Sequence, residues 1–306
     1  MRFLLEDHIR RPEIKSNKST DENHNVTALI ILYTVLAILC AVFGGYLFGP
    51  RFIESNQIVD YVETIDCLIG NNEYLMEVSR PIFDCDVCRH LKTFPIVNNI
   101  TEEEFSDKYA YSAVPVLVKN AVKDWSAMET FSYDYFKEIY TKDPGIIRSV
   151  EEECQFFPYS TEFRSLGELF QMQDARAQYE SGEKPWYVGW SNCNHQVQEE
   201  LRKHYHRPHF LPTDAESSAI DWIFMGGRGL GAAIHLDSVR RPSWQAQIQG
   251  SKTWHLVPPP ECQFTCSPLK VHMAPGDIIV VDTNQWYHST FIHDGNVSIT
   301  IGSEYD

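Results

Sequence analysis

The sequence predicts a mainly β domain with helices before its strands, attached to a single membrane-spanning helix. Six short apolar-rich segments after residue 219 are separated by turn signals, which is typical of a β-barrel or β-sandwich. The chain has 306 residues, of which 43% are hydrophobic and 13% aromatic, so a mainly disordered or fibrous protein is excluded. Its formal net charge of −16 argues against a nucleic-acid partner, because such binding depends on basic side chains that neutralise phosphates.

The predicted membrane helix covers residues 26–49. No charged residue occurs from Asn25 to Pro50, and an uncharged, mostly apolar stretch of this length can span a hydrocarbon core that needs about 20 helical residues. A buried core helix is an alternative, but one without a polar face is uncommon in a small domain. A cleaved signal peptide fits less well, because its apolar region is shorter, about 7–15 residues, and lies nearer the first residue.

The basic residues that flank this helix predict its orientation. Four of them lie at positions 10–18, before the helix, whereas Arg51 alone follows closely. The positive-inside rule therefore predicts a type II membrane protein whose helix is a signal anchor and whose larger part is lumenal or extracellular, in the endoplasmic reticulum, the Golgi or at the cell surface. The predicted segments are a cytoplasmic tail (1–25), the transmembrane helix (26–49), a stalk (50–80) and a lumenal domain (81–306).

Cysteines and glycosylation sequons are compatible with an oxidising compartment. Seven of the eight cysteines follow the predicted membrane helix, and an odd number leaves one of them free or intermolecular. Cys85-Asp-Val-Cys88 could be half of a zinc site or a redox pair, but no second CxxC exists, so we expect structural disulfides. Sequons begin at Asn99 and Asn296, which predicts a glycoprotein.

The elements of the predicted domain follow from local patterns. Residues 114–119 (VPVLVK) are typical of a strand, and aromatic spacing predicts a helix at 131–140. A second short helix is predicted at 196–204. The six later strands are expected at 219–224, 232–237, 244–249, 253–257, 277–282 and 297–302. Gly250-Ser251 predicts a tight hairpin between the third and fourth of these, and residues 275–277 (PGD) predict another turn.

A candidate metal site begins at His235-Leu236-Asp237. Residues two apart on a strand point to the same face, so this imidazole and this carboxylate would lie together. They supply two of the three ligands of the 2-His-1-carboxylate arrangement that holds non-haem Fe(II), and His288, after a later strand, is placed to be the third. By itself the HxD pattern is weak, because a surface or core pair arises by chance in many chains.

The residues between the two histidines carry a resemblance to a known family. Residues 244–254 (WQAQIQGSKTW), with 275–277 and 286–288 (WYH), resemble the Jumonji-C (JmjC) oxygenases of the cupin superfamily. The resemblance is clearest over 219–303 and weaker at 114–121. It implies a double-stranded β-helix, or jelly roll, and dependence on Fe(II), 2-oxoglutarate and O2. The nearest subgroup is the phosphatidylserine-receptor-like lysyl hydroxylases, which have the same 17-residue step from first histidine to lysine.

The resemblance also implies residue roles. His235, Asp237 and His288 match the iron ligands of these enzymes, which form their catalytic centre. Lys252 matches the lysine that pairs with the distal carboxylate of 2-oxoglutarate, Thr300 matches a threonine that hydrogen-bonds the same carboxylate, and Gln245 stands where the subgroup has an asparagine near the cosubstrate. One departure is Ala232, which stands where these enzymes often have a threonine. A tyrosine such as Tyr187 could replace that donor.

Residues 244–248 support a polar cavity lining. Gln245 and Gln247 would share one strand face, opposite apolar residues at 244, 246 and 248.

The expected activity is hydroxylation, or N-demethylation, of a protein side chain in the secretory pathway or at the cell surface. Two other functions remain open. One is a non-catalytic cupin-like ectodomain that acts as a receptor or binding module, and the other is a cupin that uses a different metal without 2-oxoglutarate. Lys252 and Thr300 argue against both, because neither has an obvious role without a dicarboxylate. The oligomeric state is left open.

Overall fold

The computed structural model describes residues 31–40 and 73–306, except residues 181 and 294. Within it, Glu73–Asp306 form one compact unit. This unit contains every predicted strand and every candidate site residue.

The predicted tail, most of the predicted membrane helix and residues 50–72 of the predicted stalk lie outside the described residues. Residues 31–40, from the middle of the predicted membrane helix, are helical, and their side chains are exposed. Among the residues that the structure describes, no helix combines the length and the hydrophobicity needed to cross a membrane.

The helices of the compact unit are short, and several begin at a side chain that caps their first turn. Ser132, Asp143 and Ser165 each accept a hydrogen bond from a backbone N–H of the helix that follows, which satisfies a donor that would otherwise lack a partner. The helices are α3 (Glu73–Ser79), α4 (Asp86–Arg89), α5 (Glu102–Lys108), α6 (Ala127–Thr130), α7 (Tyr133–Thr141), α8 (Pro144–Glu153), α9 (Leu166–Phe170), α10 (Asp174–Ala177), α11 (His195–Leu201) and the 3-10 turn η1 (Pro260–Cys262). The helices predicted at 131–140 and 196–204 correspond to α7 and α11.

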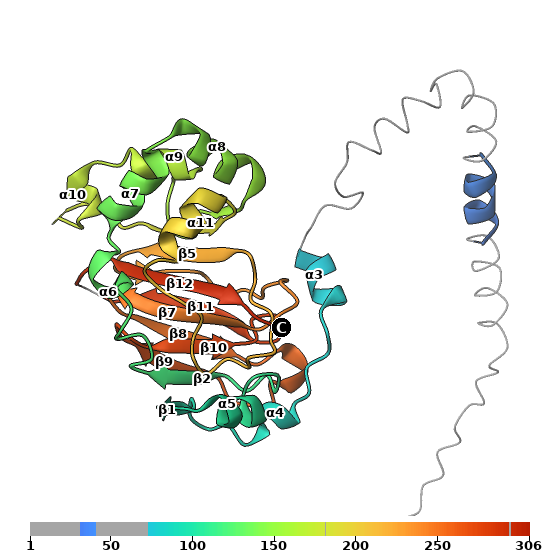
Figure 1. The fold of residues 1–306 in the computed structure, drawn as a ribbon. Helices are drawn as coiled ribbons and strands as arrows, with labels where there is room; N and C mark the ends of the chain where they lie inside the picture. Colours follow the sequence, from blue (N-terminus) through green and yellow to red (C-terminus); the bar gives the residue numbers. More distant parts are fainter. Residues whose placement is uncertain (1–30, 41–72, 181, 294) are drawn as a thin grey trace, which may run out of the picture. The chain divides into compact units, whose positions relative to one another are not determined.

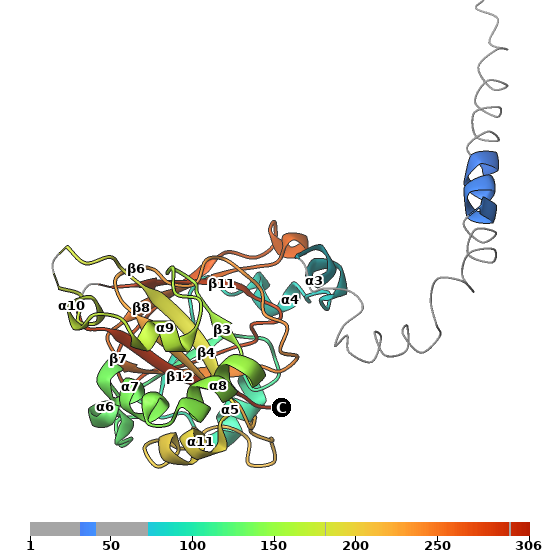
Figure 2. The same cartoon turned by 90° about the horizontal axis from the view of Figure 1, so that it is seen from above.

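The strands form two sheets. They are β1 (Ile96–Asn98), β2 (Val116–Lys119), β3 (Phe156–Phe157), β4 (Tyr187–Asn192), β5 (Asp221–Gly226), β6 (Gly229–Leu230), β7 (Ser243–Gln249), β8 (Lys252–Val257), β9 (Leu269–Met273), β10 (Ile278–Val281), β11 (Tyr287–Ile292) and β12 (Ser298–Glu304). The large sheet has the order β1-β2-β10-β7-β12-β5-β4-β3, and the small sheet has the order β6-β11-β8-β9. Apart from the parallel β1–β2 pair, all strand pairs are antiparallel. Seen from above, the labels of β6, β8 and β11 lie on one side of those of β4, β7 and β12 (Figure 2).

The hairpin predicted at Gly250-Ser251 is wrong. The turn is there, with Gly250 at a positive φ of 65°, but it joins β7 in the large sheet to β8 in the small sheet. Strand β7 pairs with β10 and β12, and β8 pairs with β9 and β11, so the chain crosses between the sheets at this glycine. Connections that cross between two sheets are typical of a jelly roll, whereas a hairpin would keep both strands in one sheet.

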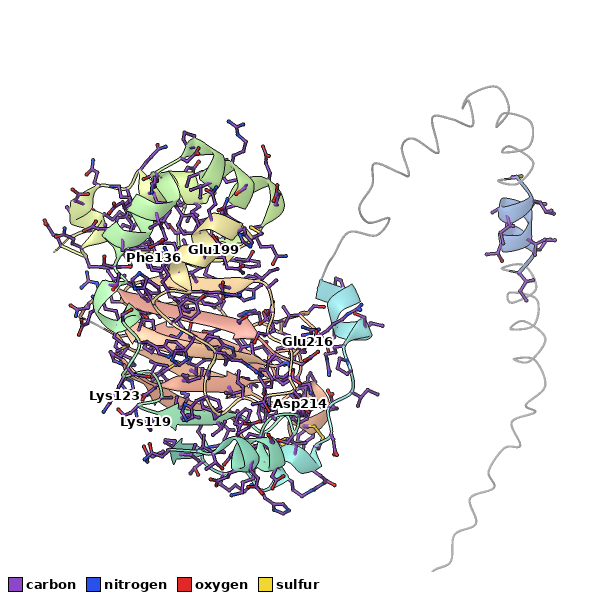
Figure 3. The ribbon with its side chains drawn as sticks, in the orientation of Figure 1. Lys119, Lys123, Phe136, Glu199, Asp214 and Glu216 are labelled. Atoms are coloured by element: carbon purple, nitrogen blue, oxygen red, sulfur yellow. A yellow bond between two sulfur atoms is a disulfide. The ribbon has the colours of Figure 1, made fainter. Side chains whose placement is uncertain are left out.

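Two hydrophobic cores lie on opposite faces of the large sheet. On the outer face, Trp244, Ala246 and Ile248 of β7 join the core formed with α7–α9 and α11. Figure 1 shows these helices gathered beyond the β5 side of the sheet, and Figure 3 places Phe136 of α7 where they meet it. The inner core lies between the sheets, where Leu117 and Ile279 pack with buried residues of β8 and β9. The predicted alternation along β7 is therefore confirmed for its apolar face.

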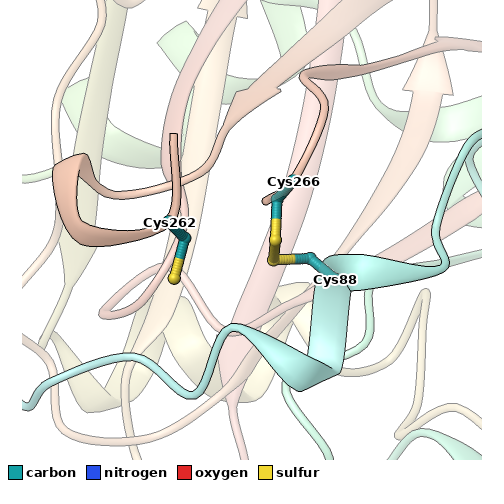
Figure 4. Close-up of side chains that lie close together, drawn as sticks. All are labelled: Cys88, Cys262 and Cys266. Atoms are coloured by element: carbon teal, nitrogen blue, oxygen red, sulfur yellow. A yellow bond between two sulfur atoms is a disulfide. The ribbon is translucent and has the colours of Figure 1, made fainter. Parts of the chain in front are cut away.

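Three disulfides stabilise the unit. Cys85 pairs with Cys262 and Cys88 with Cys266, so both cross-links join the segment around α4 to the loop between β8 and β9. In Figure 4, Cys88 is joined to Cys266 and Cys262 lies alongside. The expectation that the CxxC cysteines form structural disulfides is confirmed.

The third disulfide pairs Cys154 with Cys193 and joins the end of α8 to the end of β4. Cys40 is free and exposed, and Cys67 lies outside the described residues.

Candidate active site

Two backbone hydrogen bonds bring His235 and His288 side by side. The amide of His235 donates to the carbonyl of His288 (3.0 Å), and the amide of His288 donates to the carbonyl of His235 (2.8 Å). This is an isolated bridge, and the strand predicted at 232–237 is not formed. Pairing with β11 does not extend beyond His235, because the backbone amide of Asp237 donates to the backbone carbonyl of Thr283 (2.9 Å) and not to β11.

The side chains of His235, Asp237 and His288 converge. Nε2 of His235 lies 3.3 Å from Oδ1 of Asp237, and Nε2 of His288 lies 3.7 Å from Oδ2 of the same carboxylate. One ligand atom from each residue falls within 4.8 Å of the others. The predicted triad is therefore assembled, and its third member, His288, comes from a later strand, β11, as expected.

The protonation of the triad suits a cation. Burial lowers the pKa of His288 to about 4, so this imidazole is neutral at neutral pH, which is the form that binds metals. Burial opposes the charge on Asp237, but the two neighbouring imidazoles outweigh it and hold the pKa of that carboxyl below its usual value. The site thus presents a carboxylate and a neutral imidazole. The donor set is the one that non-haem Fe(II) prefers.

Backbone and aromatic contacts orient the histidine rings. Nδ1 of His235 contacts the carbonyl of Ala233 (2.7 Å), and Nδ1 of His288 contacts the carbonyl of Trp286 (3.1 Å), which directs both Nε2 atoms at Asp237. The ring of Trp254 is stacked on His288, with centroids 5.5 Å apart.

Tyr159 lies beside His235, with ring centroids 5.9 Å apart. Tyr159 was not among the predicted site residues, because it lies between β3 and α9, where no sequence motif marks it.

Lys252 is the third feature of the interior. Its side chain is almost fully buried, and its ammonium lies over the rings of Trp254 (5.2 Å) and Phe224 (5.6 Å). Its hydrogen bond is to Oε1 of Gln245 (3.2 Å), and among the described residues no carboxylate pairs with it. Burial lowers the pKa of Lys252 to about 7. A buried cation without a counter-ion is costly, so this position is suited to an anionic ligand.

Gln245 and Thr300 reach the same interior from the large sheet. Gln245 contacts Lys252 directly, as described above. Thr300 is fully buried and lies opposite Phe224 in the register of β12 and β5, so both Thr300 and Lys252 adjoin this ring. The Thr300 hydroxyl donates to Oε1 of Gln247 (3.3 Å). The Gln247 amide in turn donates to Ser298 (2.8 Å), so Gln247 belongs to a closed polar network.

Ala232 contributes its backbone where relatives often have a threonine side chain. Its amide donates to Oγ1 of Thr290 (3.0 Å). Thr290 also lies beside the hydroxyl of Tyr187, which is buried in β4. A threonine and a tyrosine hydroxyl therefore stand close to the position that lacks the expected donor.

These residues define a class of protein. A jelly roll whose interior carries two histidines, one carboxylate and a buried unpaired lysine fits Fe(II) at the triad and a dicarboxylate beside the lysine. This is the arrangement of a JmjC-type cupin, and the resemblance found in the sequence is confirmed by the comparisons with known proteins. Residues 101–265, just over half of the chain, match the family model described as a cupin-like domain, and the chain belongs to this family. The match includes His235, Asp237 and Lys252.

Curated relatives are named as demethylases, hydroxylases or oxygenases. The chain is 27% identical over 186 residues to an arginine-specific demethylase of Arabidopsis thaliana (JMJ22), covering 58% of this chain and 32% of the relative. It is 24% identical over 170 residues to a bifunctional arginine demethylase and lysyl-hydroxylase of Caenorhabditis elegans (psr-1), covering 53% and 40%. Over 106 residues it is 26% identical to the 2-oxoglutarate and iron-dependent oxygenase JMJD4 of Danio rerio, covering 26% and 25%. The chain thus spans well under half the length of each of these relatives.

Proposed function

We propose that this protein is an Fe(II)- and 2-oxoglutarate-dependent oxygenase that uses O2 to hydroxylate, or to N-demethylate, a side chain of a protein substrate. The observation that carries the proposal is the pairing of the triad with Lys252 in one interior. A metal site alone would suit many cupins, but a buried lysine without a carboxylate partner favours the binding of an anion that the fold does not supply. The names of the curated relatives support the same chemistry.

Each site residue has a role in this proposal. His235, Asp237 and His288 hold the iron and leave coordination positions open for the cosubstrate and O2. Lys252 binds the distal carboxylate of 2-oxoglutarate, while Gln245 orients the ammonium and Thr300 offers a hydroxyl. Iron and 2-oxoglutarate, when bound, would supply the oxidising chemistry together with O2.

Aromatic rings adjoin both parts of the site. Trp254 and Phe224 flank the lysine, and Tyr159 and Trp254 adjoin the two histidines. Lys252 is buried, and the exclusion of water there strengthens the ion pair between its ammonium and a bound carboxylate.

The proposed location is the lumenal or extracellular side of a membrane, with residues 26–49 as a signal anchor. The absence of charge from Asn25 to Pro50 and the distribution of basic residues around this segment support it. Three disulfides also favour an oxidising compartment. Asn99 and Asn296 are exposed, so both sequons are accessible for glycosylation. The substrate in this proposal is a protein of the secretory pathway or cell surface.

A direct test is a titration of the purified full chain with 2-oxoglutarate under anaerobic conditions in the presence of Fe(II). A chelated complex gives a weak visible metal-to-ligand charge-transfer band. We expect this band in the wild type, no band in His235→Ala, and a band that needs far more 2-oxoglutarate in Lys252→Ala. A folded wild-type protein with stoichiometric iron and no band would refute the oxygenase and favour the alternative of a non-catalytic binding module.

A further inference from the structure

A cavity of about 400 Å³ opens beside the metal ligand Asp237. It is lined by the loop that follows this ligand, by the turn between β10 and β11, and by the segment at the end of α3. Leu236, Asp237, Ser238 and Arg240 contribute from the first of these segments. The cavity is lined by a metal ligand but not by Lys252, so it could hold a substrate side chain beside the metal without displacing a carboxylate bound at the lysine.

Three of the four charged groups that line the cavity are already held by neighbouring groups. Arg80 makes ion pairs with Glu77 (2.9 Å) and Glu261 (2.6 Å). Asp282 accepts hydrogen bonds from the backbone and side chain of Asn284 and from the side chain of Gln285. Asp237 faces the two histidines.

The fourth charge, Arg240, is exposed, and among the described residues it has no ion-pair partner. An anionic group that entered the cavity would therefore find one available cation.

The backbone holds Arg240 in an unfavourable conformation at this position. Its φ is +63°, in the left-handed region that residues with a side chain rarely adopt. Oδ1 of Asn284 fixes this conformation by accepting from the amides of Val239 and Arg240 (2.8 Å each). The amide of Asn284 also donates to the carbonyl of Arg241 (3.0 Å). Local strain that is maintained by neighbouring contacts is characteristic of functional positions.

We propose that Arg240 is a specificity-determining residue that binds a carboxylate of the substrate, so that the preferred substrate is a peptide with an acidic residue near the modified side chain. This inference rests on the proposed function. It distinguishes the chain from an enzyme that selects for positive charge around its target, because the exposed charge of the cavity is the Arg240 cation, whereas the Asp282 carboxylate is half-buried and already accepts three hydrogen bonds.

The test compares three pools of fluorescein-labelled peptides of equal length, whose variable positions carry Glu, Gln or Lys. Binding to the full chain is measured by fluorescence anisotropy at low ionic strength, anaerobically, with Fe(II) and 2-oxoglutarate present. We expect the Glu pool to bind about fivefold more tightly than the Gln pool, and the Lys pool to bind most weakly, as for a single partly exposed ion pair.

Substitutions separate the effect of the Arg240 charge on peptide binding from effects on folding. Arg240→Asn removes the charge with a residue that tolerates the left-handed conformation, and we expect it to bind the Glu and Gln pools equally. Arg240→Lys should restore most of the preference. Arg241→Asn is the matched control, because Arg241 does not line the cavity and instead faces Asp306 (3.4 Å). It should behave as the wild type.

The charge-transfer band, measured on the same samples, distinguishes a failure of the Arg240 proposal from a failure of the oxygenase proposal. A normal band with no preference for the Glu pool, or with a preference that persists in Arg240→Asn, would overturn the role of Arg240 and leave the oxygenase standing. Absence of the band in wild-type protein would refute the oxygenase, and the role of Arg240 with it.

Discussion

Lys252 and Gln245 form a hydrogen bond of 3.2 Å between two strands that belong to different sheets. The amide oxygen of Gln245 is a neutral acceptor, so it orients the ammonium without cancelling its charge. The charge is thereby kept available inside the barrel, at a cost to the stability of the unliganded protein.

Replacing Lys252 should have opposite effects on ligand binding and on stability. We expect Lys252→Met to weaken 2-oxoglutarate binding by about 100-fold, because a buried carboxylate would lose its charged partner. We also expect the same change to raise the unfolding free energy of the unliganded protein by about 1 kcal/mol, because an uncompensated buried cation disappears. Calorimetric titration and urea denaturation measure the two effects. Lys270→Met, at an exposed position of β9, is the control and should change neither.

The stability of the unliganded protein should increase with pH because of Lys252. Its pKa is about 7 when folded and 10.5 by its ordinary value, so between these limits the unfolded chain binds the additional proton. Unfolding then takes up a proton, and raising the pH from 7 towards 10.5 disfavours it, by at most about 1.4 kcal/mol per pH unit. Urea denaturation of wild type and Lys252→Met at pH 7, 8 and 9 measures the difference. Equal slopes for the two proteins would contradict a depressed lysine pKa.

The affinity for a metal ion should depend on His288 of β11 but not on His255 of the neighbouring strand β8. We expect His288→Ala to reduce Mn(II) affinity by at least about 100-fold, because one of three protein ligands is lost. His255 of β8 lies outside the triad and is partly exposed, so His255→Ala should bind as the wild type does. Calorimetry with Mn(II) alone avoids oxidation of the metal. Similar losses in both variants would point to a general effect on folding.

The contributions of Cys85–Cys262 and Cys88–Cys266 to the free energy of unfolding should be strongly non-additive. Each closes a loop of almost the same length, with sequence separations of 177 and 178. With one of them intact, the other closes only a small ring, so its removal should cost about 2–3 kcal/mol, whereas removal of both should cost about 7 kcal/mol.

Urea denaturation of the single and double Cys→Ser variants tests this non-additivity. Cys154–Cys193, with a separation of 39, closes a short loop nested inside the two long ones and changes their effective length only slightly, so it serves as the control and its removal should add almost fully to either loss. Costs that simply add for the two neighbouring bridges would exclude the shared-loop explanation.

The sequence predicted the site better than it predicted the path of the chain. His235, Asp237 and His288 converge as expected. The reason given for it, that His235 and Asp237 share one face of a strand, is wrong. The backbone amide of Asp237 donates to the carbonyl of Thr283, and residues 232–237 form no strand. What local patterns could not reveal is which sheet receives each strand. The Gly250-Ser251 turn has the same sequence signal whether it closes a hairpin or crosses between sheets. Strand β4 was also missed, since its burial on both faces removes the alternation that marks half-exposed strands.

The position of β12 has a consequence for how the chain is made. This strand follows β5 and β7 in the chain, but it lies between them in the large sheet. Until it is synthesised, both neighbours present unpaired edges, and those edges can pair with other chains. The large sheet therefore cannot be completed before β12 has left the ribosome. We expect nascent chains to need chaperone protection until β12 has emerged, and removal of residues 297–306 to prevent folding altogether.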